Sequence, residues 1–179
     1  MKWKLYLPAL GAVALSAVVL AITAYAFKNL CAIRAEEELQ TMLRAMLPGS
    51  TVFTNHDVDG GAVQTLYEGS TGTVAQVTCP GYVYDVTMLV AVDDRGRVVA
   101  LTVRDAHETL GLGSDILYNY EFLAQFLRST GQNQVEENIV PISGATVSSR
   151  AVSRCVNLAV AVVTGVDVPT QATPWEDGA

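Results

Sequence analysis

The first hydrophobic segment of the chain is an uncharged run from Leu5 to Phe27. A helix of that length crosses a hydrocarbon core of about 30 Å. A cleaved signal peptide is the alternative, but its apolar region is shorter and a small-residue cleavage pattern follows it, whereas residues 24–26 lead directly into a phenylalanine and a lysine. The pattern therefore predicts that residues 1–27 form a cytoplasmic N-terminus and an uncleaved transmembrane anchor.

A partial apolar stripe follows this anchor. Its members are Leu39, Leu43, Met46 and Leu47. Three glutamates at 36–38 favour a helix start near them, and the Pro-Gly pair at 48–49 ends the pattern. Residues 28–50 are thus predicted to form a connecting helix that leads to a domain at 51–165.

Runs of β-branched and apolar residues occupy the middle of the chain. Residues 74–79 form one expected strand, and residues 82–92 and 97–103 are two longer runs separated by an Asp-Asp-Arg-Gly turn. This composition predicts an antiparallel hairpin. Because the run at 82–92 is apolar on both faces, we expect the two later helices to cover both faces of the sheet.

Two helical patterns follow the hairpin. The first begins at Ser114-Asp115 and is ended by a glycine at 131, and its expected core stripe is Ile116, Tyr120, Leu123 and Leu127. The second stops before a glycine at 165, and its stripe is Val152, Val156, Ala159 and Val163. Residues 166–179 lack a pattern and are predicted to be a disordered tail. The elements together predict an α+β protein, in which a single transmembrane helix precedes an antiparallel sheet packed by helices.

Composition adds an acidic domain to this picture. Half of the 179 residues are hydrophobic and the net charge is −7. All 18 acidic residues follow the apolar run, whereas Lys2 and Lys4 precede it. The acidic balance excludes nucleic acid as a partner. The two early lysines favour a single pass through the inner (plasma) membrane with the domain on the extracytoplasmic side.

Three cysteines, Cys31, Cys79 and Cys155, are spread along the chain without a C-x-x-C pair. We therefore expect no zinc or iron–sulfur site. A Cys79–Cys155 disulfide would suit an exported domain, and free buried cysteines are the alternative.

A run of small residues precedes the last helix and is the best candidate for functional chemistry. It consists of Ser143, Gly144, Ala145 and Thr146. Ser143 is the expected N-cap, which places Thr146 in the first turn. Unpaired N–H groups and the positive end of the helix macrodipole would stabilise a phosphate at Thr146. An ordinary loop-to-helix junction is the alternative. Arg150 and Arg154 either contact such a phosphate or are solvated.

A second candidate is the run His-Glu-Thr-Leu-Gly-Leu-Gly at 107–113. Glycines on both sides of Leu112 leave backbone N–H groups accessible, which suits a loop that cradles phosphate or sugar. The alternative is a surface turn, because an adjacent His-Glu pair does not complete a metal site.

These two motifs, in this order and with Gly81-Tyr82 upstream, resemble the FMN-binding domain found in the G subunit of Rnf electron-transport complexes. The C subunit of the sodium-pumping NADH:quinone reductase is related to it. The resemblance covers roughly residues 1–164. That family has an aspartate six residues before its flavin-bearing threonine and a proline in the upstream run, where this chain has Val140 and Leu110.

The resemblance implies that residues 51–165 are an FMN-binding domain in which Thr146 carries FMN through a phosphoester bond. The other cofactor-binding residues that it implies are Ser143, Gly144, Ala145, Glu108, Thr109, Leu112 and Gly113. Glu108 and Thr109 would make polar contacts to the flavin, and Leu112 would contact its ring. No metal is expected.

The implied role is that of an electron-carrier subunit, not an enzyme on its own, in an ion-translocating Rnf-type complex (ferredoxin:NAD oxidoreductase). Its partners would be other integral membrane subunits and a flavin-attaching transferase. Two further interpretations stay open: a cofactor-free interaction module of a membrane complex, and a stand-alone extracellular flavin reductase domain.

Overall fold

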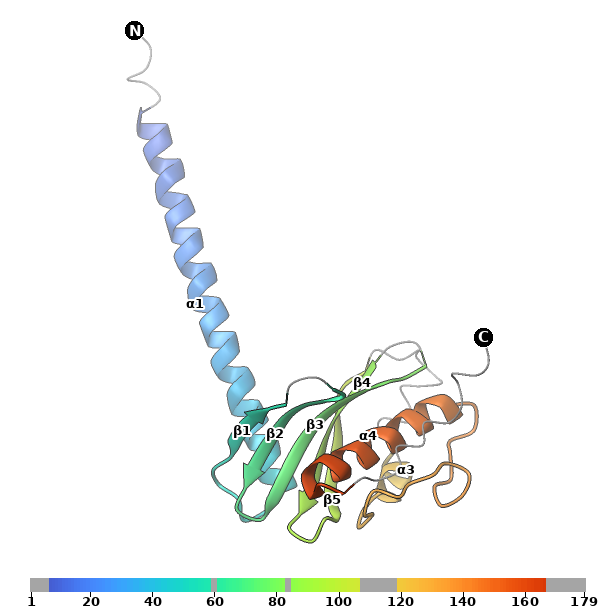
Figure 1. Cartoon of the computed structure of the whole chain (residues 1–179). Helices are drawn as coiled ribbons and strands as arrows, with labels where there is room; N and C mark the ends of the chain where they lie inside the picture. Colours follow the sequence, from blue (N-terminus) through green and yellow to red (C-terminus); the bar gives the residue numbers. More distant parts are fainter. Residues whose placement is uncertain (1–6, 59–60, 83–84, 107–118, 167–179) are drawn as a thin grey trace. The chain divides into compact units, whose positions relative to one another are not determined.

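The computed structural model describes residues 7–58, 61–82, 85–106 and 119–166 (Figure 1). The chain divides into two compact units, residues 1–42 and residues 43–179. The described residues of the first unit belong to one long helix, and the second unit contains the sheet and two later helices.

The N-terminal helix, α1 (Leu7–Met46), is one continuous helix. Its described stretch Ser16–Met46 is long and apolar enough to cross a membrane, and its most apolar window has no side chain buried against protein, which indicates a membrane anchor. The separate helix start expected near Glu36 is not present. The glutamates continue the helix instead, because residues 12–47 contain no glycine or proline that would end it before them. Gln40 Nε2 donates to Glu36 Oε1 at 3.2 Å within this continuous helix.

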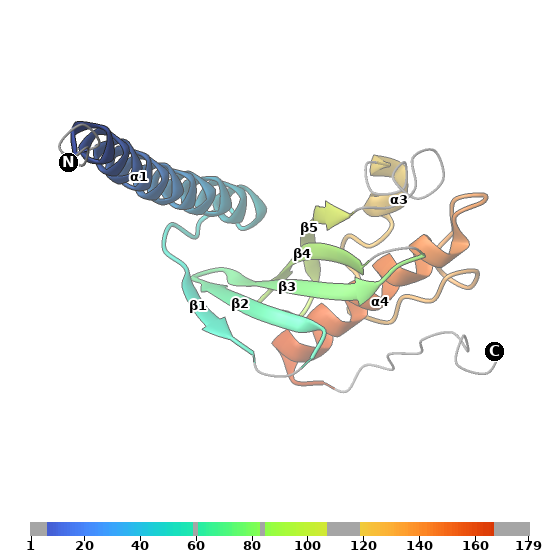
Figure 2. The ribbon, with the colours of Figure 1, turned by 90° about the horizontal axis from the view of Figure 1, so that it is seen from above.

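Five strands form an antiparallel meander in the order β1-β2-β3-β4-β5 (Figure 2). The strands are β1 (Thr54–Asp57), β2 (Val63–Gly69), β3 (Gly72–Pro80), β4 (Asp85–Asp93) and β5 (Val98–Ala106). Consecutive antiparallel strands need only short turns, which the Gly-Ser-Thr-Gly and Asp-Arg-Gly runs between them supply. The predicted strand at 74–79 and the predicted hairpin are both confirmed.

Asp93 holds the turn between β4 and β5. Its Oδ1 accepts from the Arg97 backbone N–H at 2.8 Å, and its Oδ2 accepts from the Arg97 guanidinium at 2.9 Å. Desolvation of Asp93 opposes ionisation, but the hydrogen bonds from Arg97 outweigh it and lower the pKa of the carboxyl below its ordinary value.

The main core lies on one face of the sheet, where α4 (Thr146–Thr164) covers β3 and β4 (Figure 2). Val86, Met88 and Val90 of β4 pack in one cluster with Val152 and Val156 of α4, which confirms the apolar stripe of this helix. The five-residue helix α3 (Tyr120–Ala124) contributes to the same cluster. Leu89 and Ala91, which alternate with the cluster residues on β4, are also fully buried, so both faces are covered as expected, but the two later helices lie in one cluster and do not cover both. Leu43 and Leu47, at the start of the second unit, are fully buried outside this cluster.

The core stripe expected around α3 is confirmed at Leu123, which packs against the core cluster, and is wrong at Tyr120 and Leu127, whereas Ile116 lies outside the described residues. Tyr120 is 87% exposed and Leu127 is 45% exposed, and the buried side chains are Phe122 and Phe126, whose rings meet edge to face at 5.3 Å. The helix begins at the N-cap Asn119, whose side chain accepts from the Phe122 N–H, and gives way to turns after Ala124. A helical period of 3.6 residues does not continue through turns, so Phe122 and Phe126 are buried instead of the residues of the stripe.

Candidate functional site

A tight turn introduces α4. The Ala145 N–H donates to the Ile142 carbonyl at 3.0 Å, and Gly144 lies in the left-handed region with φ of 81°. This turn makes Ala145 the N-cap, with no side-chain cap hydrogen bond, and Thr146 the first helical residue. The prediction that Ser143 caps the helix is therefore wrong, because the turn leaves Ser143 exposed and two residues before the cap.

Ser149 stabilises this turn from inside the helix. Its buried Oγ donates to the Ala145 carbonyl at 2.9 Å and accepts from the Ile142 N–H at 3.3 Å. The motifs in the sequence did not single out this residue. The available signal was a serine four residues after the cap, a spacing from which a hydroxyl bonds back to a helix carbonyl.

The N–H groups of the first turn of α4 therefore lack the side-chain cap that most helix starts have. Thr146 is half-buried, and its neighbours Ser143 and Gly144 are exposed. The first turn thus combines a hydroxyl, the positive end of a 19-residue helix and an open approach from solvent. An arrangement of this kind would stabilise an anion at Thr146.

Polar residues continue from Thr146 along one face of α4. Arg150, Ser153 and Asn157 follow it at spacings of four, three and four residues, which aligns them on a helix. The side chain of Asn157 is hydrogen-bonded through both its oxygen and its nitrogen. Its Oδ1 accepts from the backbone and side chain of Asn133 at 3.0 and 2.8 Å, and its Nδ2 donates to the Asn133 carbonyl at 2.9 Å. This buried pair holds the segment before Thr146 against α4.

Arg150, in contrast, is only partly paired. Its Nη2 lies 3.5 Å from Glu136 Oε2, and within the described part of the chain its buried Nε has no hydrogen-bond partner. Glu136 is exposed and sits at φ of 75°, a backbone conformation that costs a non-glycine residue energy. An unpaired buried guanidinium N–H, one helical turn after Thr146, is the kind of donor that a phosphate oxygen satisfies.

The segment between α3 and α4 is held by reciprocal hydrogen bonds. Gln125 Nε2 donates to the Val140 carbonyl at 3.2 Å, and Gln125 Oε1 accepts from the Val140 N–H at 2.8 Å. The Val140 side chain is 73% exposed. The backbone path to Thr146 is thus fixed by Gln125, and the side chain at position 140 makes little contribution to packing.

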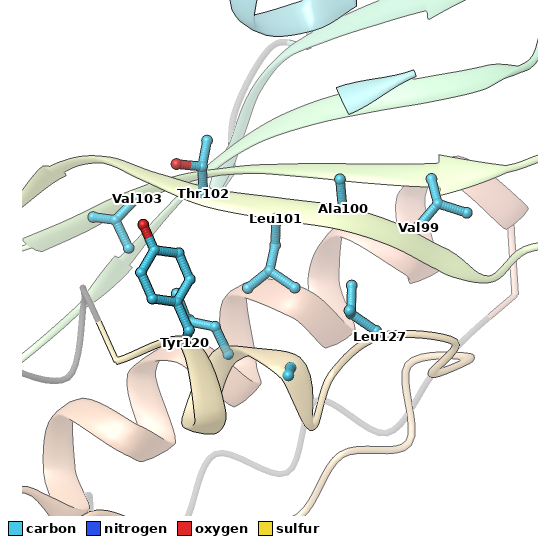
Figure 3. A pocket seen from close by; sticks show the side chains of 9 residues that line it. Val99, Ala100, Leu101, Thr102, Val103, Tyr120 and Leu127 are labelled. Atoms are coloured by element: carbon cyan, nitrogen blue, oxygen red, sulfur yellow. The ribbon is translucent and has the colours of Figure 1, made fainter. Parts of the chain in front are cut away.

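A mostly apolar pocket of about 430 Å³ lies between edge strand β5 and α3 (Figure 3). In Figure 3, Leu101 of β5 and Leu127 point into the space, and the Tyr120 ring stands beside β5. Its lining residues among the described part of the chain do not include Ser143 or Thr146. The other predicted site residues, Glu108, Thr109, Leu112 and Gly113, lie outside the described residues, as does the predicted start of the helix at Ser114.

The turn before α4 lies in a stretch of the chain that matches a known family. Residues 81–161 match the family model described as the FMN-binding domain. No curated protein matches the chain significantly. The matched stretch contains β4, β5, α3, the turn at 142–145 and most of α4. The second unit therefore carries an FMN-binding domain, and Thr146 and Arg150 lie within it.

Proposed function

We propose that this chain is a membrane-anchored electron carrier whose FMN is joined to Thr146 through a phosphoester bond. The FMN-binding domain supports flavin binding, and the long apolar helix supports the anchor. The observation that carries the covalent link is the Thr146 hydroxyl, which lies in an uncapped first turn inside the matched domain.

The residues around Thr146 fit the phosphodiester that would join Thr146 to the flavin. The free N–H groups of the first turn and the unpaired Arg150 Nε are donors, and both would offset the negative charge of the phosphate. The exposed Ser143 and Gly144 leave the backbone approachable. Arg150 would exchange its weak contact with the exposed Glu136 for a charge-assisted bond to the phosphate.

Bound FMN supplies one- and two-electron transfer, which no amino acid side chain in this domain provides as readily. The protein's part is to hold, orient and protect the cofactor. A covalent bond at Thr146 prevents loss of the flavin on the extracytoplasmic side of the membrane, where we place the domain. A flavin-attaching transferase would act on the Thr146 hydroxyl through the exposed turn.

We propose further that the partners are integral membrane subunits of an ion-translocating Rnf-type complex. The motifs at 107–113 and 143–146 support this assignment, together with the single anchor helix. In such a complex the chain would pass electrons between subunits and would not perform a reaction alone.

A cofactor-free interaction module is the second candidate. It is favoured by Val140, an exposed apolar side chain at the position where the resembled family has an aspartate. An exposed aspartate can form hydrogen bonds or ion pairs with a modifying enzyme, and an exposed valine cannot.

Mass spectrometry of the protein purified from its own host separates the two candidates. A peptide that contains Thr146 and carries the mass of an FMN phosphoester supports the carrier. The same peptide without the modification, from a host that flavinylates its other proteins, contradicts it. Thr164→Ala, a change at the far end of α4, is the matched control and should leave the modification in place.

A further inference from the structure

Two thiols meet in the core of the second unit. Cys79 of β3 and Cys155 of α4 are both fully buried, at 0% exposure, and both belong to the main core cluster. Cys155 Sγ lies 3.8 Å from the Val86 carbonyl, and Val86 is the cross-strand partner of Cys79. Both thiols are free in this structure, and the Cys155 thiol lies close enough to Cys79 for its ionisation to be affected by it. The fold therefore brings together two cysteines that are far apart in the sequence.

The two buried thiols are unreactive while they are reduced. Desolvation by burial, followed by the effect of the neighbouring Cys79 thiol, raises the pKa of the Cys155 thiol well above its ordinary value. A protonated thiol is a poor nucleophile, and a fully buried one does not meet an oxidant. Cys31 differs from both, because it lies exposed on α1.

We propose that Cys79 and Cys155 form a disulfide that links β3 to α4 when the second unit folds on the extracytoplasmic side. The proposal rests on the location that we propose for the domain, where disulfides persist. Each thiol loses a proton, the S–S bond forms, and the two electrons reduce the disulfide of a dithiol oxidase to two thiols. The exchange must precede burial, since the attacking sulfur has to be an accessible thiolate.

The link has a direct consequence for the cofactor anchor. Thr146 and Cys155 lie on the same helix, and Cys79 lies on the central strand of the meander. The disulfide would therefore tie the flavin-bearing helix to the sheet. It also closes a long loop that contains most of the FMN-binding domain, and long loops restrict the unfolded chain most strongly.

The test uses the full-length protein in detergent with Cys31→Ser, which removes the exposed thiol and leaves the core unchanged. The protein is unfolded with urea and a reductant and is then refolded either with oxidised glutathione or with reductant. After oxidative refolding we expect a mass lower by about 2 Da, a Cys79–Cys155 cross-linked peptide, and no alkylation of either cysteine when the protein is unfolded in urea without a reductant. We also expect a higher urea midpoint for the oxidised protein than for the reduced protein.

Alkylation of both cysteines after oxidative refolding would refute the proposal, as would a lower urea midpoint for the oxidised protein. In cells, the same protein is trapped by acid and alkylated, and we expect it to be cross-linked. A protein that cross-links on refolding but is recovered reduced from cells would overturn the extracytoplasmic location. Flavin content, measured on the same samples, tests the proposed cofactor separately.

Discussion

Two substitutions in one turn should separate the cofactor anchor from the stability of the fold. The first is Thr146→Ala. Within the described part of the chain, the Thr146 hydroxyl makes no hydrogen bond, and alanine has a higher helix propensity than threonine by roughly 0.5 kcal/mol. We therefore expect the free energy of unfolding to change by no more than about 0.5 kcal/mol, while covalent flavin is lost completely.

The second substitution is Ser149→Ala, three residues further along the same helix. It removes two hydrogen bonds at a fully buried site, one to the Ala145 carbonyl and one from the Ile142 N–H. At about 1 kcal/mol each, less roughly 0.5 kcal/mol for the better helix propensity of alanine, the loss should be about 1.5 kcal/mol. Flavin should still be attached, because Thr146 is unchanged.

The assay pairs in-gel flavin fluorescence with urea unfolding followed by circular dichroism. Thr146→Ala should be dark with an unchanged midpoint, and Ser149→Ala should be fluorescent with a lower midpoint. Fluorescence in Thr146→Ala would show that the flavin is attached elsewhere. An unchanged midpoint in Ser149→Ala would show that its two hydrogen bonds do not hold the turn.

Three further predictions address the fold and the topology. In urea unfolding, Asn157→Ala should destabilise the domain by about 3 kcal/mol, because it leaves buried groups of Asn133 unpaired. Ser153→Ala should be neutral or stabilising, because the buried hydroxyl that it removes has no partner among the described residues. Because the pKa of Asp93 is lowered, its contribution to stability is complete above pH of about 4 and is lost as the pH falls below that value. The difference in urea midpoint between the unchanged protein and Asp93→Asn should therefore shrink from pH 5 to pH 3. An unchanged difference would contradict the assignment. A reporter active only in the cytoplasm, fused after Ala179, should be silent, and activity would reverse the proposed orientation.

Local patterns predicted the elements whose environment is simple. The hairpin at 85–106 follows from two β-branched runs around a turn, and α4 follows from a stripe with a glycine at its end. The region around α3 was predicted less well, because Tyr120 and Leu127 fit a helical stripe in a segment where the helix lasts five residues. Which side chains are buried there depends on the sheet beneath, and sequence spacing does not report that contact.

The site shows the same division. Thr146 was placed in the first turn by taking Ser143 as the N-cap, and the structure also has Thr146 in the first turn. The cap was assigned to the wrong residue, since the turn at Gly144 moves the helix start. The contact with Glu136 decides which N–H groups of Arg150 are paired, and the hydrogen bonds of Asn133 to Asn157 hold the segment before Thr146 against α4. Those contacts join residues that are 14 and 24 positions apart, and a single sequence does not disclose them.

The way in which strand β5 ends the sheet affects the tendency of the isolated domain to aggregate. β5 is an edge strand, and Val98 exchanges hydrogen bonds with Arg128 and Ser129, at 2.7 and 2.9 Å. Arg128 reaches this position through a left-handed backbone conformation, with φ of 66°. The contact covers the first residue of β5 and shortens the open edge that another chain could extend, which lowers the tendency of the isolated domain to aggregate during overexpression.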